Sequence, residues 1–438
     1  MRNRSYSRTH ASHRVLTIAA AAAIFALTLF NSASAYTLKT LHSFCTENNC
    51  GDGLQPWAGL LMDQAGNLYG TTAIGGKYYE GVVFKLIPNA KKTKYAEHIL
   101  KNFCAKPSCP GGKDPLAGLI MDVDGNLYGT TGSGGKFGGG VVFKMAHRDN
   151  GWSFSVIHSF CGANDCAGGT GPTTRLSYVG QASGAPWDEF SPLFGTTYYG
   201  GANGKGVAYQ LTEDGSLWNY EVLHSFNASN GSDSADPGPV LVDSSLNLYG
   251  VTASGGRYGF GVLYRLAGGT WKETTLHNFC AEPNCADSGL GLGQLAMDAA
   301  GDLFGATLRG GAHGSGGIFE RTAGGAYSVI YNFCSQQGCT DGFYPAGGLT
   351  MDAGGELFGA TVDGGTGDNG TIFKLSYDSG TQQWTENILY NFCGHDRDCK
   401  KGKEPHASLI VDASGNLYGT TFDGGANGDG GTVFELTP

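Results

Sequence analysis

Short runs of β-forming residues, separated by glycine-rich turns, recur along the chain after its first 35 residues. One clear copy has an apolar run at Gly118–Asp122, a second at Leu127–Thr131 and a third at Val141–Met145. A fourth run ends in Phe160, with an aromatic residue, Trp152, eight positions earlier. Short runs of this kind, bounded by turn residues, are typical of strands. The pattern predicts a unit of four antiparallel strands, named a, b, c and d in chain order.

This unit occurs seven times. The aromatic residue within strand b marks each copy and recurs at intervals of 54 to 66 residues, as Tyr69, Tyr128, Phe194, Tyr249, Phe304, Phe358 and Tyr418. A four-stranded unit repeated in this way is typical of a β-propeller. The last copy stops after strand c, at Val433–Leu436, and residues 36–44 form a spare strand d before the first copy. We therefore predict an all-β fold, in which residues 36–438 form a single seven-bladed β-propeller of four-stranded blades. The N-terminal strand completes the last blade and closes the ring.

The repeat also explains an unusual composition. Glycine contributes 74 of the 438 residues, about 17 % where about 7 % is usual. The glycines stand before strand b, at its end and in the loop to strand c. They do not recur at every third position, which excludes a collagen helix. The 40 % of hydrophobic residues argues against a disordered linker.

Residues 1–35 have the pattern of a secretory signal peptide. Four arginines precede an apolar stretch at Val15–Phe30, and Ala33–Ala35 is a small-residue cleavage site. The alternative is an uncleaved membrane anchor. No later stretch is apolar enough to span a bilayer, so we expect no membrane span after cleavage. The chain has 38 acidic against 28 basic residues, which disfavours nucleic acid as a partner, because phosphate contacts need cations.

Twelve cysteines form six close pairs in the sequence. The pairs are Cys45 and Cys50, Cys104 and Cys109, Cys161 and Cys166, Cys280 and Cys285, Cys334 and Cys339, and Cys393 and Cys399. An even number, regular spacing and an export signal together predict six local disulfides. Zinc is the alternative, but zinc sites combine two neighbouring pairs, and these pairs lie more than forty residues apart. We expect no metal, no cofactor, and a secreted or periplasmic location.

Six acidic residues precede strand a and form the first candidate ligand site. A proline usually lies four residues before the first leucine of that strand, and the acids stand just before it or at the corresponding place: Asp52, Asp114, Asp236, Asp287, Asp341 and Glu404. Strand a lines the channel of a propeller, so these carboxylates could ring its mouth and hold a cation or a cationic ligand. The alternative is that each aspartate organises a turn.

Aromatic residues in the loops between strands b and c form the second candidate site. The candidates are Tyr78, Tyr79, Phe137, Tyr198, Tyr199 and Tyr258. Exposed rings suit stacking on sugars or contact with a protein. The alternative is that each ring packs over its neighbouring blade.

Two further features depart from the regular repeat. Blade three has an insert, residues 180–191, in which Trp187, Asp188 and Glu189 could contact a ligand, with drift of one repeat as the alternative. His42, His158, His224 and His277 occupy one position of strand d, where other copies have Lys101, Tyr331 and Tyr390. We expect these histidines to be spread around the rim, which argues against a shared metal site.

The motif Gly-Asn-Leu-Tyr-Gly-Thr-Thr, followed by Gly-Gly and Gly-x-Val-Phe-Lys-Leu, resembles the GloVer tandem repeat over nearly the whole chain after residue 35. This resemblance implies an exported bacterial protein and supplies neither an activity nor catalytic residues. Members often carry a C-terminal anchor. This sequence ends at Thr437–Pro438 without one, so we expect free secretion or a periplasmic location.

We expect a non-catalytic binding protein, monomeric, with its ligand at the loop face. The expected partner is an extracellular carbohydrate or a protein. One alternative is a carbohydrate-active enzyme that uses the channel-mouth carboxylates as acid and base, and another is a structural surface module. The motifs Gly-x-Ser-x-Gly and His-Glu-x-x-His do not occur in the sequence, so no nucleophile or zinc-protease motif favours catalysis.

Overall fold

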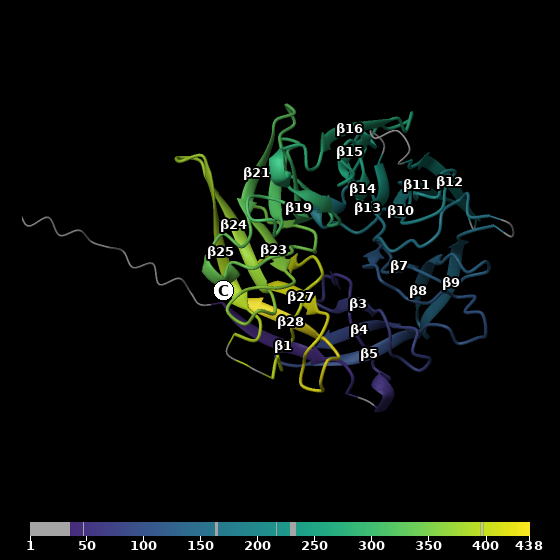
Figure 1. The fold of residues 1–438 in the computed structure, drawn as a ribbon. Coiled ribbons are helices and arrows are strands. Elements are labelled where there is room, and N and C mark those ends of the chain that lie inside the picture. Colours follow the sequence, from purple (N-terminus) through teal and green to yellow (C-terminus); the bar gives the residue numbers. More distant parts are fainter. Residues whose placement is uncertain are drawn as a thin grey trace, which may run out of the picture. The chain divides into compact units, whose positions relative to one another are not determined.

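Strand b of the repeat is largely buried, because it lies between two neighbouring blades. In Leu127–Thr131 all five residues are buried. The computed structural model describes residues 36–438 except residues 47, 163, 164, 216, 228–233, 395 and 397. The predicted signal peptide, residues 1–35, lies outside the described residues. Seven antiparallel sheets follow one another around a ring (Figure 1), which confirms the predicted propeller.

In blades one to six the strands follow one another in chain order, with strand a nearest the channel. Blade one contains β2 (Leu61–Met62), β3 (Leu68–Thr72), β4 (Val82–Pro88) and β5 (Tyr95–Asn102), and blade two contains β6 (Ile120–Met121), β7 (Leu127–Thr131), β8 (Val141–Arg148) and β9 (Gly151–Ser159). Blade three contains β10 (Leu193–Thr197), β11 (Val207–Asp214) and β12 (Leu217–Ser225), and blade four contains β13 (Ser234–Val242), β14 (Leu248–Gly255), β15 (Val262–Leu266) and β16 (Glu273–Asn278). Blade five contains β17 (Gly289–Gly291), β18 (Ala296–Met297), β19 (Leu303–Arg309), β20 (Gly317–Arg321) and β21 (Tyr327–Asn332). Blade six contains β22 (Thr350–Met351), β23 (Leu357–Thr361), β24 (Thr371–Asp378) and β25 (Gln383–Asn391).

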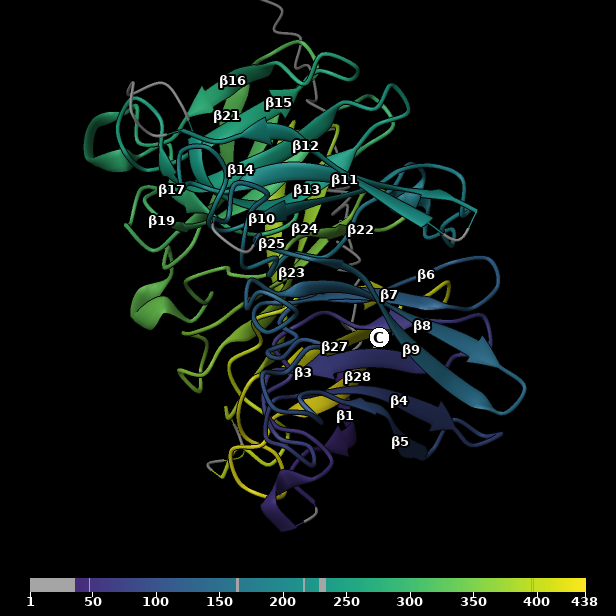
Figure 2. The ribbon, with the colours of Figure 1, turned by 90° about the vertical axis from the view of Figure 1, so that its right-hand side faces the viewer.

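The seventh blade joins the two ends of the described chain. It contains β26 (Ile410–Val411), β27 (Leu417–Thr421), β28 (Thr432–Thr437) and the N-terminal strand β1 (Thr37–Ser43). Strand β1 pairs antiparallel with β28, with Thr37 opposite Thr437. Figure 2 shows the purple β1 beside the yellow β28. The predicted closure is confirmed, and it removes an open junction between the first and last blades.

The hydrophobic core is divided into seven clusters, one between each pair of neighbouring blades. The cluster between blades one and two combines Tyr69, Val83 and Phe103 with Leu127 and Phe143. The cluster across the closure combines Phe44 and Val433 of blade seven with Leu60 and Phe84 of blade one. Each blade is therefore stabilised by apolar surface buried on both of its faces.

The glycine within strand b is required by the phenylalanine of strand c. A Cβ atom at Gly129 would lie 2.7 Å from the Phe143 ring and 2.8 Å from Leu119. The same contact recurs at Gly70 with Phe84 and at Gly419 with Phe434. The central glycine of the Leu-Tyr-Gly-Thr-Thr motif thus leaves the space that a buried aromatic ring fills.

Blades three and five deviate from the regular pattern. Strand a of blade three is reduced to a bridge between Ser177 and Phe194, and strand a of blade five is split into β17 and β18. The described residues also include four short 3-10 helices. They are η1 (Asn48–Cys50), η3 (Pro283–Cys285) and η4 (Gln337–Cys339) in cysteine loops, and η2 (Gln181–Ser183) in the blade-three insert.

Candidate functional site in the channel mouth

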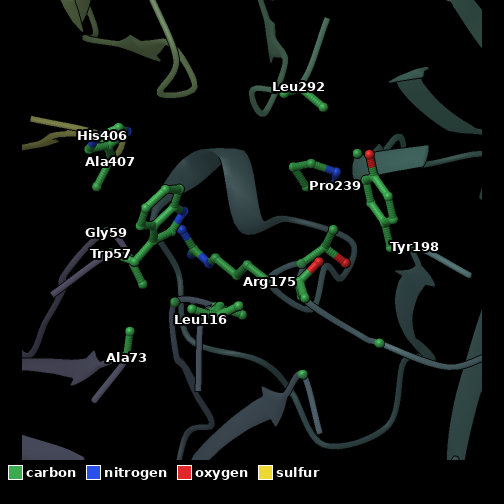
Figure 3. Close-up of a pocket in the computed structure, with 18 of the residues that line it drawn as sticks. Trp57, Gly59, Ala73, Leu116, Arg175, Tyr198, Pro239, Leu292, His406 and Ala407 are labelled. Atoms are coloured by element: carbon green, nitrogen blue, oxygen red, sulfur yellow. The ribbon is translucent and has the colours of Figure 1, made fainter. Parts of the chain in front are cut away.

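The segments that lead into strand a surround a cavity of about 810 Å³ on the axis of the ring. All seven blades contribute to its lining, which includes Trp57, Leu116, Arg175, Leu292 and His406 (Figure 3). Residues of the b–c loops, such as Tyr198 and Tyr199, complete the rim. The cavity therefore opens on the loop face on which the sequence predicted a ligand.

Arg175 is an exception at a position where the other blades carry small or neutral residues. Its counterparts include Gly59, Gly118, Gly348 and Ser408. A Cβ atom at Gly118 would lie 3.5 Å from Cδ of Arg175, so the small neighbours leave room for this one long side chain. In Figure 3 the guanidinium reaches across the opening in the direction of Trp57.

The blade-three insert holds the head of Arg175. With the amide of Gln181 oriented so that its oxygen faces the guanidinium, Nε and Nη2 of Arg175 donate hydrogen bonds of 3.0 and 2.9 Å. Burial lowers the pKa of Arg175 from its usual value. Among the described residues, no carboxylate forms an ion pair with this guanidinium. A desolvated arginine without a counter-charge favours an anionic ligand.

An aromatic wall lies at the junction of blades seven and one. The ring of Trp57 stacks on His406 with centroids 4.5 Å apart, and Phe422 contacts Trp57 edge-on at 5.0 Å. Burial lowers the pKa of His406 to about 4, so its imidazole is neutral near pH 7. Trp57 stays 42 % exposed, which leaves part of its ring available for stacking.

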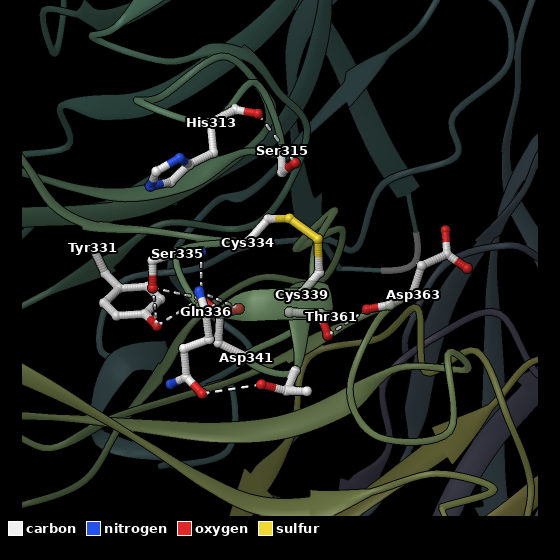
Figure 4. Close-up of a disulfide and its surroundings, with 11 residues drawn as sticks. His313, Ser315, Tyr331, Cys334, Ser335, Gln336, Cys339, Asp341, Thr361 and Asp363 are labelled. Carbon is white, nitrogen blue, oxygen red and sulfur yellow. Dashed lines mark hydrogen bonds between the residues drawn. A yellow bond between two sulfur atoms is a disulfide. The ribbon is translucent and has the colours of Figure 1, made fainter.

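The six predicted acids occupy two positions of the repeat, so they do not form one ring. Asp52, Asp287 and Asp341 are buried in the cysteine loops, where backbone N–H groups donate to their carboxylates. Figure 4 shows Asp341 beside the Cys334–Cys339 disulfide, and it accepts hydrogen bonds from Ser335 and Tyr331. Each of these carboxylates thus accepts hydrogen bonds within its own loop, as the turn interpretation expects, and none of the three lines the cavity.

The other three acids stand immediately before the proline that enters strand a. Asp114, Asp236 and Glu404 have φ values of 57°, 56° and 56°, although a residue before proline is usually extended. Only Asp114 of the three lines the cavity. Asp236 accepts a 2.6 Å hydrogen bond from Ser254. Burial and the nearby Asp423 raise the pKa of Glu404.

The predicted loop aromatics are divided between the cavity and the outer surface. Tyr198 and Tyr199 line the cavity and meet edge-on at 4.7 Å. Tyr78, Tyr79, Phe137 and Tyr258 are 40 to 50 % exposed and are not part of its lining. Three of these rings lie under the cation of the preceding residue: Lys77 on Tyr78, Lys136 on Phe137 and Arg257 on Tyr258.

The blade-three insert has a structural role that the sequence did not reveal. Trp187 is buried in the cluster between blades two and three, and its indole N–H donates to the Ser191 carbonyl. Its backbone pairs with Asp122 of blade two. The pKa of Glu189 is raised to about 7 by its hydrogen bond with the Asp122 carboxylate and by burial. Trp187 is thus core rather than a ligand contact.

All six predicted disulfides are formed. Disulfides persist in oxidising compartments, so they indicate an extracellular or periplasmic protein. In the described part of the chain, no helix is both long enough and apolar enough to cross a membrane. The bonds join Cys45 to Cys50, Cys104 to Cys109, Cys161 to Cys166, Cys280 to Cys285, Cys334 to Cys339 and Cys393 to Cys399.

The second cysteine of a pair anchors the b–c loop of the blade that follows it. The carbonyl of Cys166 accepts a hydrogen bond of 2.9 Å from the backbone N–H of Gly201, and that of Cys399 accepts one of 2.9 Å from Gly425. Cys166 and Cys399 are half-buried, and neither lies in a helix or strand. Neither lines the cavity, so these cysteines shape the loops around the channel mouth and are not ligand contacts.

The sequence did not single out the cavity residues Arg175, Trp57 and His406. Nor did it single out Gln181, whose amide oxygen accepts from Arg175. A signal was present for Arg175, because the repeat has small or neutral residues at its position in the other blades. Trp57 and His406 directly follow the strand-a proline in blades one and seven, where blades two and six have Leu116 and Ala346.

Comparison with solved structures finds similar chains at low sequence identity. The extracellular domain of a protein assigned as a one-component system in B. thetaiotaomicron matches with a TM-score of 0.50 and 11 % identity, over 91 % of this chain and 42 % of that one. A gluconolactonase from Xanthomonas campestris has a TM-score of 0.38 and 13 % identity, over 73 % and 85 % of the two chains. TolB from Acinetobacter baumannii has a TM-score of 0.40 and 13 % identity, over 82 % and 76 %.

No curated protein matches the sequence. One family model, however, matches twice in tandem. The Gloeobacter/Verrucomicrobia repeat covers residues 22–191 and again residues 181–350. These matches confirm the family that the strand-b motif suggested. The chain therefore belongs to the Gloeobacter/Verrucomicrobia repeat family.

Proposed function

We propose that this protein binds a small anionic sugar, of the uronic-acid class, in the mouth of its channel. The proposal depends above all on Arg175, which brings a guanidinium without a carboxylate partner among the described residues into a cavity of about 810 Å³. Cavities of about 300–1,000 Å³ are usual for small-molecule sites. A sugar carboxylate would supply the missing counter-charge as a bidentate partner.

The rest of the lining suits a sugar ring. The exposed part of Trp57 offers a flat apolar surface, on which the C–H face of a sugar can stack. The Asp114 carboxylate can accept hydrogen bonds from sugar hydroxyls. His406 is neutral near pH 7 because burial lowers its pKa to about 4, so Arg175 and Asp114 are the charged residues among those that line the cavity.

Binding is better supported than hydrolysis. Glycoside hydrolysis commonly uses two carboxyl groups about 5–9.5 Å apart across one bond. Asp114 is the only carboxylate among the described residues that line this cavity. The cavity therefore offers one acidic residue where this kind of hydrolysis would need two. We place the protein outside the cytoplasm, secreted or periplasmic, where acidic polysaccharide fragments are accessible to it, and we expect it to act as a monomer.

The test is calorimetric titration of the purified protein with glucuronate and galacturonate, with glucose and galactose as neutral controls of similar shape. We expect the acids to bind and the neutral sugars to bind at least tenfold more weakly. The variant Arg175→Ser should lose the preference for the acids. Serine stands at the corresponding position of blade seven, as Ser408, so this variant should fold.

A second variant separates charge from stacking. Trp57→Ala should weaken both acidic and neutral sugars and leave their ratio unchanged. Equal binding of acids and neutral sugars by the wild-type protein would overturn the proposal, as would unchanged acid binding in Arg175→Ser. A hydrolysed glycan product that disappears in Asp114→Asn would favour the enzymatic alternative.

A further inference from the structure

A cluster of three side chains lies between blades seven and one, away from the channel. His42 comes from β1, Asp52 from the first cysteine loop and Glu97 from β5. One ligand atom of each lies within 4.8 Å of the others. Nε2 of His42 is 3.5 Å from Oδ2 of Asp52 and 3.6 Å from Oε1 of Glu97.

These distances are longer than those of ordinary hydrogen bonds and suit ligands that share a metal ion. An N–H···O bond usually measures about 2.7–3.2 Å. Two ligand atoms on a tetrahedral zinc ion, at bond lengths of about 2.0–2.2 Å, lie about 3.3–3.6 Å apart. Nε2 of His42 and Oδ1 of Asp52 are buried and have no hydrogen-bond partner among the described residues. Two buried polar atoms without a protein partner indicate a ligand that the described residues do not supply.

The repeat supplies an internal comparison. At the interface of blades four and five, His277 and Asp287 occupy the same positions as His42 and Asp52. There Nε2 and Oδ2 are 2.9 Å apart, a hydrogen bond. The position of Glu97 is taken by Tyr327, whose ring stacks on His277 with centroids 3.6 Å apart. Without a second carboxylate the histidine bonds directly to its aspartate, and the wider spacing is seen where Glu97 is present.

We propose that His42, Asp52 and Glu97 bind a divalent transition-metal ion, with zinc as the best fit. One imidazole and two carboxylates are hard-to-borderline ligands that zinc accepts, with water completing the coordination. A dication compensates the two carboxylate charges. Thr46 orients Asp52 by donating from its backbone N–H at 2.9 Å and from its hydroxyl at 2.6 Å. The ion would clamp the N-terminal strand to blade one.

The experiment is a zinc titration of untagged, chelator-treated full-length protein against a chromophoric competitor. We expect one equivalent of zinc to bind the wild-type protein and to raise its unfolding temperature. The variant Glu97→Tyr reproduces the His–Asp–Tyr arrangement of blades four and five, so it should fold. Loss of a supporting residue outside the ligand set typically costs about 10- to 100-fold in metal affinity, and loss of this ligand should cost at least as much.

The reciprocal variant tests whether the three residue types suffice. Tyr327→Glu should add a second zinc equivalent at His277 and Asp287. Failure of the wild-type protein to bind zinc more tightly than Glu97→Tyr would overturn the proposal. So would a zinc-induced rise in unfolding temperature of the same size in both proteins. Neither result bears on sugar binding, because the cluster is not part of the channel lining.

Discussion

The imidazole of His277 lies flat on the ring of Tyr327, with centroids 3.6 Å apart and planes inclined by 4°. Equivalent pairs join the outer strands of other neighbouring blades. His158 stacks on Tyr220 at 3.9 Å, Lys101 lies 4.1 Å above Phe154, and His224 contacts Glu273 at 2.9 Å. The histidines are therefore spread around the ring, and each belongs to one interface. One residue of each pair comes from the preceding blade, so these pairs contribute to the fit between blades.

The His158–Tyr220 pair should make the protein sensitive to acid. Burial lowers the pKa of His158 from 6.5 to about 4. Between these values the unfolded chain takes up a proton that the folded chain resists. The contribution of His158 to the free energy of unfolding is therefore complete above pH 6.5 and is lost as the pH falls towards 4. His158→Tyr keeps an aromatic ring, as at Tyr331 and Tyr390, and should show a flatter decline.

Urea unfolding midpoints from pH 7 to pH 4 measure this difference. The difference between the two proteins is the relevant quantity, because other groups titrate equally in both. Parallel curves for the wild-type protein and His158→Tyr would contradict the prediction, because they would show that protonation of His158 does not contribute to the acid sensitivity.

Glu386 should have the opposite pH dependence. Burial, and to a lesser degree the nearby Asp341, raise its pKa from 4.5 to about 8. The folded chain therefore holds a proton that the unfolded chain has released. This contribution is complete below pH 4.5 and is lost as the pH rises through 8. Glu386→Gln, which resembles the protonated form, should be more stable than the wild-type protein at pH 9 and equal to it near pH 4.5.

Thermal unfolding at the two pH values provides the measurement. Glu273→Gln is the matched control, because it weakens the contact of Glu273 with His224 and should not stabilise the protein at either pH. If Glu386→Gln were destabilised at pH 9, Glu386 would have to be a charged partner of a cation rather than a buried acid.

The blades and their closure could be predicted because every copy repeats the same local chemistry. The strand-b glycine, the strand-c aromatic residue and the unpaired strand d at residues 36–44 each follow from the order of residues in one unit. The role of the insert at residues 180–191 could not be predicted, because Trp187 packs against Ile120 and Tyr128 of the previous blade. Such a contact depends on how two blades meet.

The candidate site was predicted only in part for a related reason. Asp52 and Asp114 precede the same kind of proline at distances that differ by three residues. That difference places Asp52 against Thr46 of the disulfide loop and Asp114 at the cavity. Arg175 was not predicted because a lone arginine in an irregular segment has no local signature. It stands out only when the seven copies are superposed.

Gly129→Ala should destabilise the fold through a clash rather than through backbone strain. The added Cβ would lie 2.7 Å from Phe143, so the ring would have to shift in a close-packed core. Overpacking of this kind typically costs about 1–3 kcal/mol. Denaturant unfolding should show this loss, and Phe143→Leu in the same chain should recover part of it. Equal and additive losses from the two changes would argue against a direct contact.

Tyr264→Phe should stabilise the protein. Tyr264 occupies the strand-c position that Phe84, Phe143, Phe319, Phe373 and Phe434 occupy in other blades. Its side chain is fully buried, and its hydroxyl has no hydrogen-bond partner among the described residues. A buried hydroxyl without a partner typically costs about 1–3 kcal/mol, so its removal should raise the free energy of unfolding by about 1 kcal/mol.

The reverse change, Phe143→Tyr, places a hydroxyl in the same position of blade two and should lower stability by a similar amount. Urea unfolding with the disulfides intact compares both variants with the wild-type protein. A loss of stability in Tyr264→Phe would mean that the hydroxyl is hydrogen-bonded in solution, for example to a buried water molecule.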